Sequence, residues 1–137
     1  MTEPLLTDSD YKRLADFRYA LRRFLHFSER AAAQEGLKPQ QHQAMLAIRG
    51  REAGTTTVGV LAERLKLRHH TTVELVQRLE TAGLVTKHPA PADRRAVVLA
   101  LTAEGSARLE RLTHVHRNEL KHLGPEIVNF LSTLDPS

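Results

Sequence analysis

Seven basic side chains lie between Arg64 and Arg95, where only three residues are acidic: Glu74, Glu80 and Asp93. This segment therefore carries a net charge of +4, and the rest of the chain, with 13 basic and 13 acidic residues, is neutral. A concentrated positive field attracts phosphate groups, because each phosphate that it neutralises releases condensed counterions. The alternative is an ordinary solvated basic face. The basic residues are Arg64, Lys66, Arg68, Arg78, Lys87, Arg94 and Arg95.

Two short helices are predicted to position the first of these residues. Thr57 has the chemistry of an N-cap for a helix over residues 58–65, and a turn at 66–68 leads into a second helix over 69–82, which ends at Gly83. Thr72, Leu75, Val76 and Leu79 recur at helical spacing and predict the buried face of the second helix. Its outward faces then carry polar residues.

Two apolar runs, residues 84–88 and 96–101, predict short strands. Pro89 and Pro91 exclude a helix between them and shape a hairpin tip that carries Asp93-Arg94-Arg95. The expected fold is mostly α with a small β-hairpin wing, a winged helix-turn-helix over residues 40–102. Such a shape offers a helix to the major groove and a wing to the neighbouring backbone or minor groove, so the sequence predicts binding to double-stranded DNA.

Long amphipathic helices are expected on both sides of this region. Residues 8–35 form one, which holds five of the six aromatic residues, and a shorter helix over 40–50 follows it. Thr102 is expected to cap a helix over 103–123, broken by Gly124-Pro125 before a last short helix over 126–134. Residues 8–35 and 103–137 are interpreted as homodimerisation helices of one 137-residue domain; the alternative is a first helix packed wholly within one monomer.

The motifs "VGVLAERLKLRHHTTVELVQRLETAGLV" (residues 58–85) and "DRRAVVLALTAEG" (residues 93–105) resemble the MarR family of bacterial transcriptional regulators. The Asp-x-Arg wing tip followed by Leu-Thr-x-Glu-Gly carries most of that resemblance, which covers nearly the whole chain. It implies a homodimer that reads a pseudo-palindromic operator. It also implies repression relieved by a small molecule.

Carried onto this chain, the resemblance places the recognition helix at residue 69 and makes its outward side chains the candidates for groove contacts. Gln77 and Arg78 can form hydrogen bonds with base edges, whereas the shorter Thr71 is suited to a backbone phosphate contact. Glu74 either accepts from a cytosine amino group or, as we favour, orients Arg78. Lys87 is a further candidate. The predicted helix residues are Arg68, His69, His70, Thr71, Glu74, Gln77 and Arg78.

In the wing, Arg95 matches the arginine of the family's Asp-x-Arg motif, and either Arg94 or Arg95 is expected to enter the minor groove. Asp93 is expected to hold one of them by a charge-assisted hydrogen bond; the alternative is an exposed turn salt bridge without function. Arg68 stands where many family members have a capping Ser. The capping hydrogen bond is therefore expected to be missing, and Arg68 becomes a candidate phosphate contact.

For an effector, the resemblance points to the cleft between the dimer helices and the winged region, and to a small organic compound, anionic compounds included. Phe17, Tyr19, Arg22 and Phe24 are the candidates; the alternative is that the aromatic residues form the dimer core. The eight histidines show no chelating spacing, so we expect surface histidines, no metal site and no cofactor. His69 and His70 would still make DNA binding depend on pH.

Other classes of protein fit the sequence less well. Without cysteine there is no disulfide, thiolate metal site or thiol switch on this chain. No long apolar run or signal-like N-terminus is visible, so we expect a cytoplasmic protein without a membrane partner. No constellation of catalytic residues indicates an enzyme. A winged helix that binds only proteins would favour an acidic recognition face, whereas this one is basic.

Overall fold

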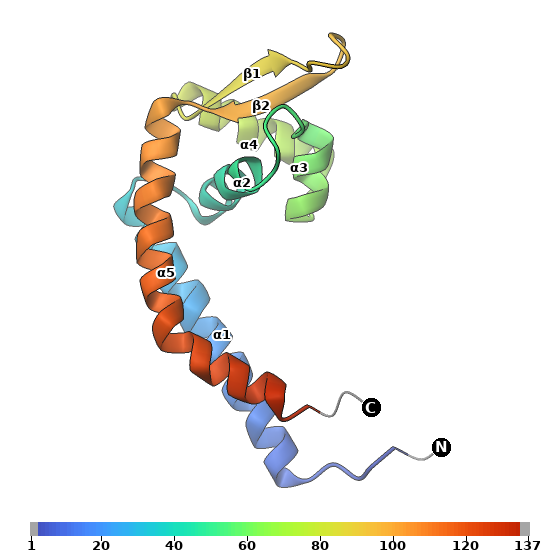
Figure 1. The fold of residues 1–137 in the computed structure, drawn as a ribbon, viewed down its shortest axis with the longest axis vertical. Helices are drawn as coiled ribbons and strands as arrows, with labels where there is room; N and C mark the ends of the chain where they lie inside the picture. Colours follow the sequence, from blue (N-terminus) through green and yellow to red (C-terminus); the bar gives the residue numbers. More distant parts are fainter. Residues whose placement is uncertain (1–2, 135–137) are drawn as a thin grey trace.

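The computed structural model describes residues 3–134, which form a winged end and a long helical stalk (Figure 1). The elements follow one another as α1 (Asp8–Gln34), α2 (Pro39–Arg49), α3 (Val58–Leu65), α4 (His69–Thr81), β1 (Val85–Pro89), β2 (Val97–Leu101) and α5 (Ala103–Ser132). The predicted fold class is confirmed. Positions 135–137 of the predicted C-terminal segment and residues 1–2 lie outside the described residues.

Most of the core lies in the winged end, which we define as residues 37–112, and Ala31 and Ala32 near the end of α1 pack into it. Met45 of α2, Leu61 of α3 and Leu79 of α4 are fully buried, and the first half of α5 closes the cluster with Leu109 and Leu112. The antiparallel hairpin pairs Val85 with Leu101 and Pro89 with Val97. The four residues predicted to form the buried face of the second short helix, Thr72, Leu75, Val76 and Leu79, are all buried.

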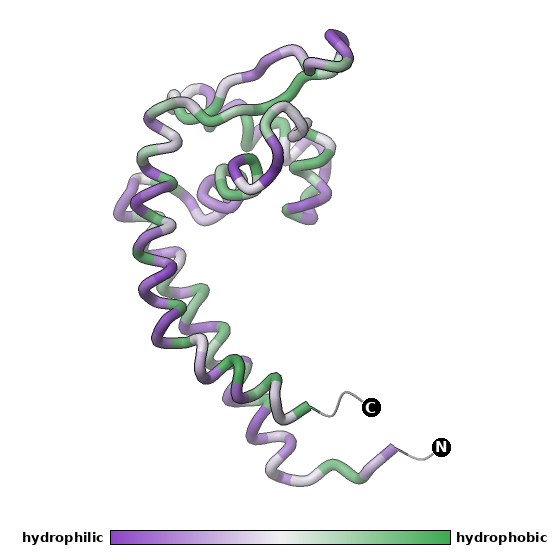
Figure 2. The backbone as a smooth tube through the Cα atoms, in the orientation of Figure 1, coloured by the Kyte–Doolittle hydropathy of each residue, from purple (hydrophilic) through white to green (hydrophobic). Residues whose placement is uncertain are grey.

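The stalk, defined as α1 together with α5 beyond Leu112, has much less of its apolar surface buried. The two helices run side by side, and the Phe17 and Phe130 rings stack at 4.4 Å between centroids near the end remote from the wing. Apolar residues nevertheless recur along both helices to their far ends (Figure 2). Several large apolar side chains of the stalk are more than half exposed: Tyr11, Leu14, Tyr19, Leu25, Val128 and Leu131.

The predicted break at Gly124-Pro125 is wrong, because α5 continues from Ala103 to Ser132 with Pro125 inside it. A proline removes one helical hydrogen bond and crowds the preceding turn, a cost that sequence rules treat as decisive. Tertiary packing on both sides opposes that cost here. Leu123 is buried just before the proline, and Phe130 stacks on α1 after it.

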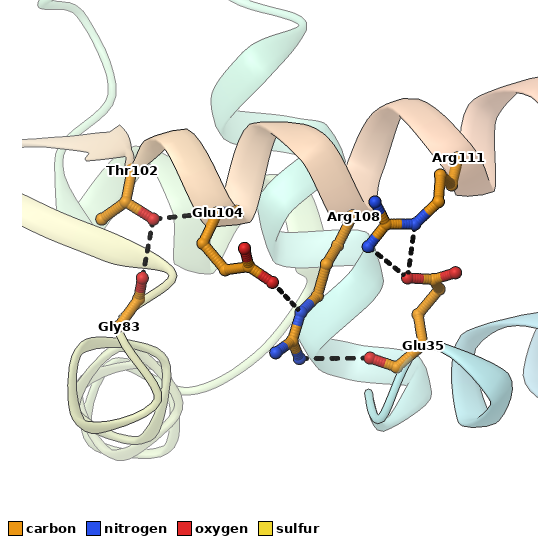
Figure 3. A network of polar contacts seen from close by, with 7 residues as sticks. Glu35, Gly83, Thr102, Glu104, Arg108 and Arg111 are labelled. Atoms are coloured by element: carbon orange, nitrogen blue, oxygen red, sulfur yellow. Dashed lines mark hydrogen bonds and ion pairs between the residues drawn. The ribbon is translucent and has the colours of Figure 1, made fainter.

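The start of α5 is fastened to both neighbouring parts of the chain (Figure 3). The Thr102 hydroxyl donates to the Gly83 carbonyl oxygen at 2.7 Å and accepts from the Gly105 backbone N–H at 3.0 Å. One turn later, Arg108 donates to the Glu35 carbonyl oxygen at 3.2 Å, and Arg111 pairs with the Glu35 carboxylate at 2.9 Å. The end of α4, the end of α1 and the first turns of α5 are thus held together.

Gly105 shows how tight this junction is. A Cβ atom at this position would lie 2.2 Å from the Leu84 carbonyl oxygen, which belongs to the backbone and cannot move aside cheaply. The Thr102 N–H also donates to that carbonyl oxygen, at 3.0 Å. Glycine is therefore required where α5 crosses the start of the hairpin.

Candidate nucleic-acid interface and adjoining cleft

The outward face of α4 is polar and exposed, as the sequence predicts. His69, His70, Glu74, Gln77 and Arg78 are exposed, whereas Thr71 is half-buried. Glu74, Gln77 and Arg78 line one shallow groove together with Thr81 and Ala82. No ion pair joins Glu74 to Arg78 in the part of the chain that the structure describes, so the expected orienting contact is not formed and the Arg78 guanidinium remains available to a ligand.

The turn before α4 explains how this helix begins without a capping side chain. Lys66 adopts a left-handed conformation with φ of 54°, which turns the chain sharply after α3. Arg68 occupies the N-cap position without a capping hydrogen bond from its side chain, as expected. Its carbonyl oxygen accepts from the Thr72 backbone N–H at 3.0 Å, the first bond of the helix, and from the Thr72 hydroxyl at 2.9 Å. The Arg68 side chain is exposed at the positive end of the helix.

The wing tip holds one arginine and leaves the other free. Asp93 Oδ1 accepts from the Arg95 backbone N–H at 3.0 Å and lies 3.5 Å from Arg95 Nε, an ion pair that does not distinguish the predicted role of the aspartate from an exposed turn salt bridge. The Arg95 side chain is still 94% exposed. Arg94 is exposed too, and among residues 3–134 no carboxylate pairs with it. Two guanidinium groups are therefore presented at the tip.

Two further contacts fix the wing relative to α4. Lys87 of β1 pairs with Glu80 of α4 at 3.1 Å, which reduces the charge that Lys87 can offer to a phosphate. On the other side, the loop after α2 reaches the hairpin: the Leu99 N–H donates to the Thr56 carbonyl oxygen at 2.8 Å. A Cβ at Gly54 would lie 3.3 Å from the Pro91 ring, so this loop also supports the tip. Sequence reasoning missed this support.

A cleft of about 440 Å³ separates α2 from the stalk helices. Its lining is mainly apolar, with Phe24 and Leu25 from α1, Pro39 and Leu46 from α2, and Leu120 from α5. Two histidines from distant parts of the chain meet at this cleft: the His42 and His116 rings are 4.8 Å apart between centroids. His42 is only 3% exposed, so the prediction that the histidines lie at the surface is wrong for this residue.

Comparisons with known proteins agree with this geometry. The model of the MarR family matches residues 35–96. The organic hydroperoxide resistance transcriptional regulator of Bacillus subtilis (strain 168) is 29% identical over 104 residues, which cover 69% of each chain. The chain is thus similar to the MarR family, whose model covers residues 35–96 of its 137 residues.

Solved structures share the fold of this chain. CouR from Rhodococcus jostii RHA1 bound to p-coumaroyl-CoA superposes with a TM-score of 0.68 at 22% identity, covering 77% of this chain and 73% of that one. A point mutant of S. aureus MepR bound to an oligodeoxyribonucleotide gives 0.69 at 18% identity and covers 96% and 100%. The relative that matches in sequence is thus described as a transcriptional regulator, and the solved structures share the fold of this chain.

The residues predicted to bind an effector do not come together in one cavity. Phe24 lines the cleft beside α2, whereas Phe17 and Tyr19 line a separate cavity of about 430 Å³ between α1 and the end of α5. Arg22 is exposed and lines neither cavity. Sequence spacing missed His42 and His116, because residues so far apart in the chain meet only once α2 has packed on α5.

No helix among residues 3–134 is both long and apolar enough to cross a bilayer. Nor do any three His, Asp or Glu side chains gather there as a metal-binding group.

Proposed function

We propose that this protein is a MarR-family homodimeric repressor that binds a pseudo-palindromic operator in double-stranded DNA and is released by a small organic effector. The observation that carries the DNA-binding surface is the pairing of an exposed polar face on α4 with two exposed arginines at the wing tip. In this arrangement α4 enters the major groove, where Gln77 and Arg78 contact base edges. Arg68 and Thr71 contact backbone phosphates.

The wing contacts the adjacent minor groove in the same complex. Arg94 and Arg95 extend from the tip, and a narrow A·T-rich groove concentrates the negative potential that favours a guanidinium group. Asp93 accepts from the Arg95 backbone N–H, which shapes the turn from which both arginine side chains extend. Lys87 has a smaller role, because its charge is already compensated by Glu80.

The stalk supports the homodimer. Its apolar side chains are unusually exposed for one chain, and they lie on α1 and on the end of α5, remote from the wing. A symmetric dimer buries such a surface against itself and places two winged ends side by side. Two recognition helices separated by about one DNA turn, roughly 34 Å, then match a two-fold operator.

The cleft between α2 and the stalk is the proposed effector site. Because α2 packs against both stalk helices and also against α3 and α4, a ligand wedged beside α2 changes the angle between the winged end and the stalk. CouR bound to p-coumaroyl-CoA shows that this fold can take an organic ligand in one relative. The peroxide response suggested by the name of the B. subtilis relative has no thiol to act on here, since these 137 residues contain no cysteine.

The experiment is fluorescence-anisotropy binding of the protein to the DNA immediately upstream of its own coding sequence, across salt and against scrambled competitor. We expect tight, competitor-resistant binding that weakens steeply with salt, because several phosphates are neutralised. Gln77→Ala should reduce the preference for this DNA, while Lys121→Ala on the exposed stalk should not. Equal loss of binding to any competitor would contradict specific recognition of this operator.

A further inference from the structure

A small cavity of about 250 Å³ lies beneath the loop that joins α2 to α3 in the winged end. Its walls come from the end of α2, from this loop, from β2 and from the first turn of α5. No residue of α4 or of the wing tip lines it, so the cavity is separate from the proposed DNA-binding surface. No residue of α1 lines it either, so it is also separate from the proposed effector cleft.

Two buried polar atoms on residues that line this cavity have no hydrogen-bond partner. They are Arg51 Nε and Thr56 Oγ1, and no other buried side-chain nitrogen or oxygen among residues 3–134 lacks a partner. Thr56 is only 2% exposed. The neighbouring Thr55 hydroxyl, by contrast, donates to the Glu52 carbonyl oxygen at 2.5 Å. A buried polar group without a partner costs free energy, and a bound molecule with suitable acceptors would remove that cost.

The chemistry of the cavity favours an anion with several oxygens. Arg51 Nε–H can only donate a hydrogen bond, and the Thr56 hydroxyl can donate one too. Within the part of the chain that the structure describes, Arg51 forms no ion pair. Arg49 lines the same cavity, so two arginines and one acidic residue, Glu52, surround it. Hydrogen bonds from a guanidinium group to an oxyanion are among the strong ones in proteins.

The size of the cavity and the presence of Glu52 restrict which anion fits. Sites for drug-sized ligands have volumes of about 300–1,000 Å³, so this smaller cavity is suited to an inorganic ion. An ionised carboxylate accepts hydrogen bonds and cannot donate them. Glu52 therefore repels an anion that has no proton and can bond to one that carries a hydroxyl group. At neutral pH hydrogen phosphate carries such a hydroxyl group and sulfate does not.

We propose that this cavity binds free phosphate. Two phosphate oxygens accept from Arg51 Nε–H and from the Thr56 hydroxyl, and the phosphate hydroxyl donates to the Glu52 carboxylate. The Arg51 and Thr56 side chains turn towards the cavity to form these bonds, because both donor atoms are covered in this structure. The bound ion thus links the two ends of the loop, residues 51 and 56, across the cavity.

The same loop supports the wing, so the bound ion also restrains the hairpin. The Leu99 N–H donates to the Thr56 carbonyl oxygen at 2.8 Å, and Gly54 lies against the Pro91 ring. A backbone amide exchanges its hydrogen when the local structure opens, and a ligand that links Arg51 to Thr56 makes opening of this loop rarer. We therefore expect the Leu99 amide to exchange more slowly when phosphate is bound.

The test compares sodium phosphate, sodium sulfate and glycerol phosphate by calorimetry at constant ionic strength and about pH 7.5, where a phosphate ester with a second pKa of about 6 has lost its proton. Phosphate should bind at millimolar concentration. Sulfate and glycerol phosphate should bind about tenfold more weakly or worse, because neither donates to Glu52. Glu52→Gln should narrow the difference between phosphate and sulfate, since an amide can donate to either. No phosphate binding, equal affinity for phosphate and sulfate, or binding without slower exchange at Leu99 would overturn the proposal.

The variant Thr56→Val separates a ligand-binding role of the hydroxyl from a structural one. The hydroxyl has no partner in the chain, so the variant should resist urea at least as well as the parent in phosphate-free buffer. Its affinity for phosphate should nevertheless fall by about tenfold or more. Lys121→Met, which removes a positive charge from the exposed stalk, should bind phosphate as the parent does. Unchanged phosphate affinity in Thr56→Val would overturn the proposal, and the comparison of phosphate with sulfate on the parent decides it if that variant does not fold.

Discussion

The winged end and the stalk differ in how completely each buries its own apolar residues. In the winged end, Met45, Leu61 and Leu79 are fully enclosed by neighbouring elements of the same chain. In the stalk, Leu14, Val128 and Leu131 are more than half exposed although their helices are long and regular. The winged end buries its own apolar side chains and the stalk does not, which indicates that another protein surface covers the stalk. Substitutions in each part test this difference.

The largest effect is expected from Gly105→Ala, which affects only the winged end. The new Cβ would meet the Leu84 backbone at 2.2 Å, so α5 must shift away from the hairpin. Overpacking of this kind costs about 1–3 kcal/mol or more in unfolding free energy. Urea denaturation measures it. Gly124→Ala is the matched control, because no atom lies within 4 Å of its Cβ position and the helix should gain stability. Equal stability of both variants would contradict the tight junction.

Leu131→Glu should dissociate the proposed dimer while leaving the winged end folded, because it places a charge in an apolar surface that is closed only by the partner. Sedimentation should show monomers, and operator binding should fall sharply since a single half-site remains. Val97→Glu, which alters a comparably exposed residue of β2, should sediment as the parent does. A Leu131→Glu dimer would show that the stalk is not the interface.

Acid should destabilise the junction between the two parts. The pKa of His42 is lowered to about 4 in the folded chain, so the unfolded chain binds more protons below its ordinary value of 6.5. The contribution of the neutral His42 ring to the free energy of unfolding is therefore fully present above pH 6.5. It is lost progressively as pH falls towards 4. Denaturation midpoints of the parent and His42→Gln, measured at pH 7.5 and 5, should converge in acid. Parallel pH dependence in both would exclude His42 as the cause.

At the wing tip, Arg95→Ala and Arg94→Ala should each weaken operator binding by about 1–3 kcal/mol without changing the oligomeric state. Arg95 is restrained by Asp93 and Arg94 is not, so Arg95 should contribute more to specificity. Anisotropy titrations with operators that have A·T-rich or G·C-rich flanks separate the loss of affinity from the loss of specificity. Unchanged affinity in both variants would remove the wing from the interface.

The smallest effects compare the helix caps of the two parts. Thr57 caps α3 in the winged end, and Thr7 caps the exposed start of α1, where it forms a reciprocal capping box with Asp10. Thr57→Ala should cost about 1 kcal/mol of unfolding free energy, as capping losses do. Thr7→Ala should cost less, because the first turn of α1 frays with little loss of packing. The order is checked by urea denaturation at one pH.

The winged end was more predictable from sequence than the stalk, for physical reasons. Thr57, Gly83 and the spacing of Leu75, Val76 and Leu79 specify local structure, and the structure follows them. Pro125 led to the wrong prediction of a helix break, because the helix-breaking cost of proline is opposed by tertiary packing that no local pattern reveals. The contact residues proposed for α4 and the wing remain predictions. The His42–His116 pair could not be predicted, since only tertiary packing brings α2 to α5.

The uninterrupted course of α5 gives the molecule the mechanics of a lever. Its 30 residues span about 45 Å at about 1.5 Å per residue. A tilt of about 5° at one end of such a rod displaces the other by roughly 4 Å, comparable to the rise of one base pair, about 3.4 Å. In the proposed dimer, a ligand that changes only an angle at the cleft would therefore change the spacing of the two winged ends enough to lose register with the operator.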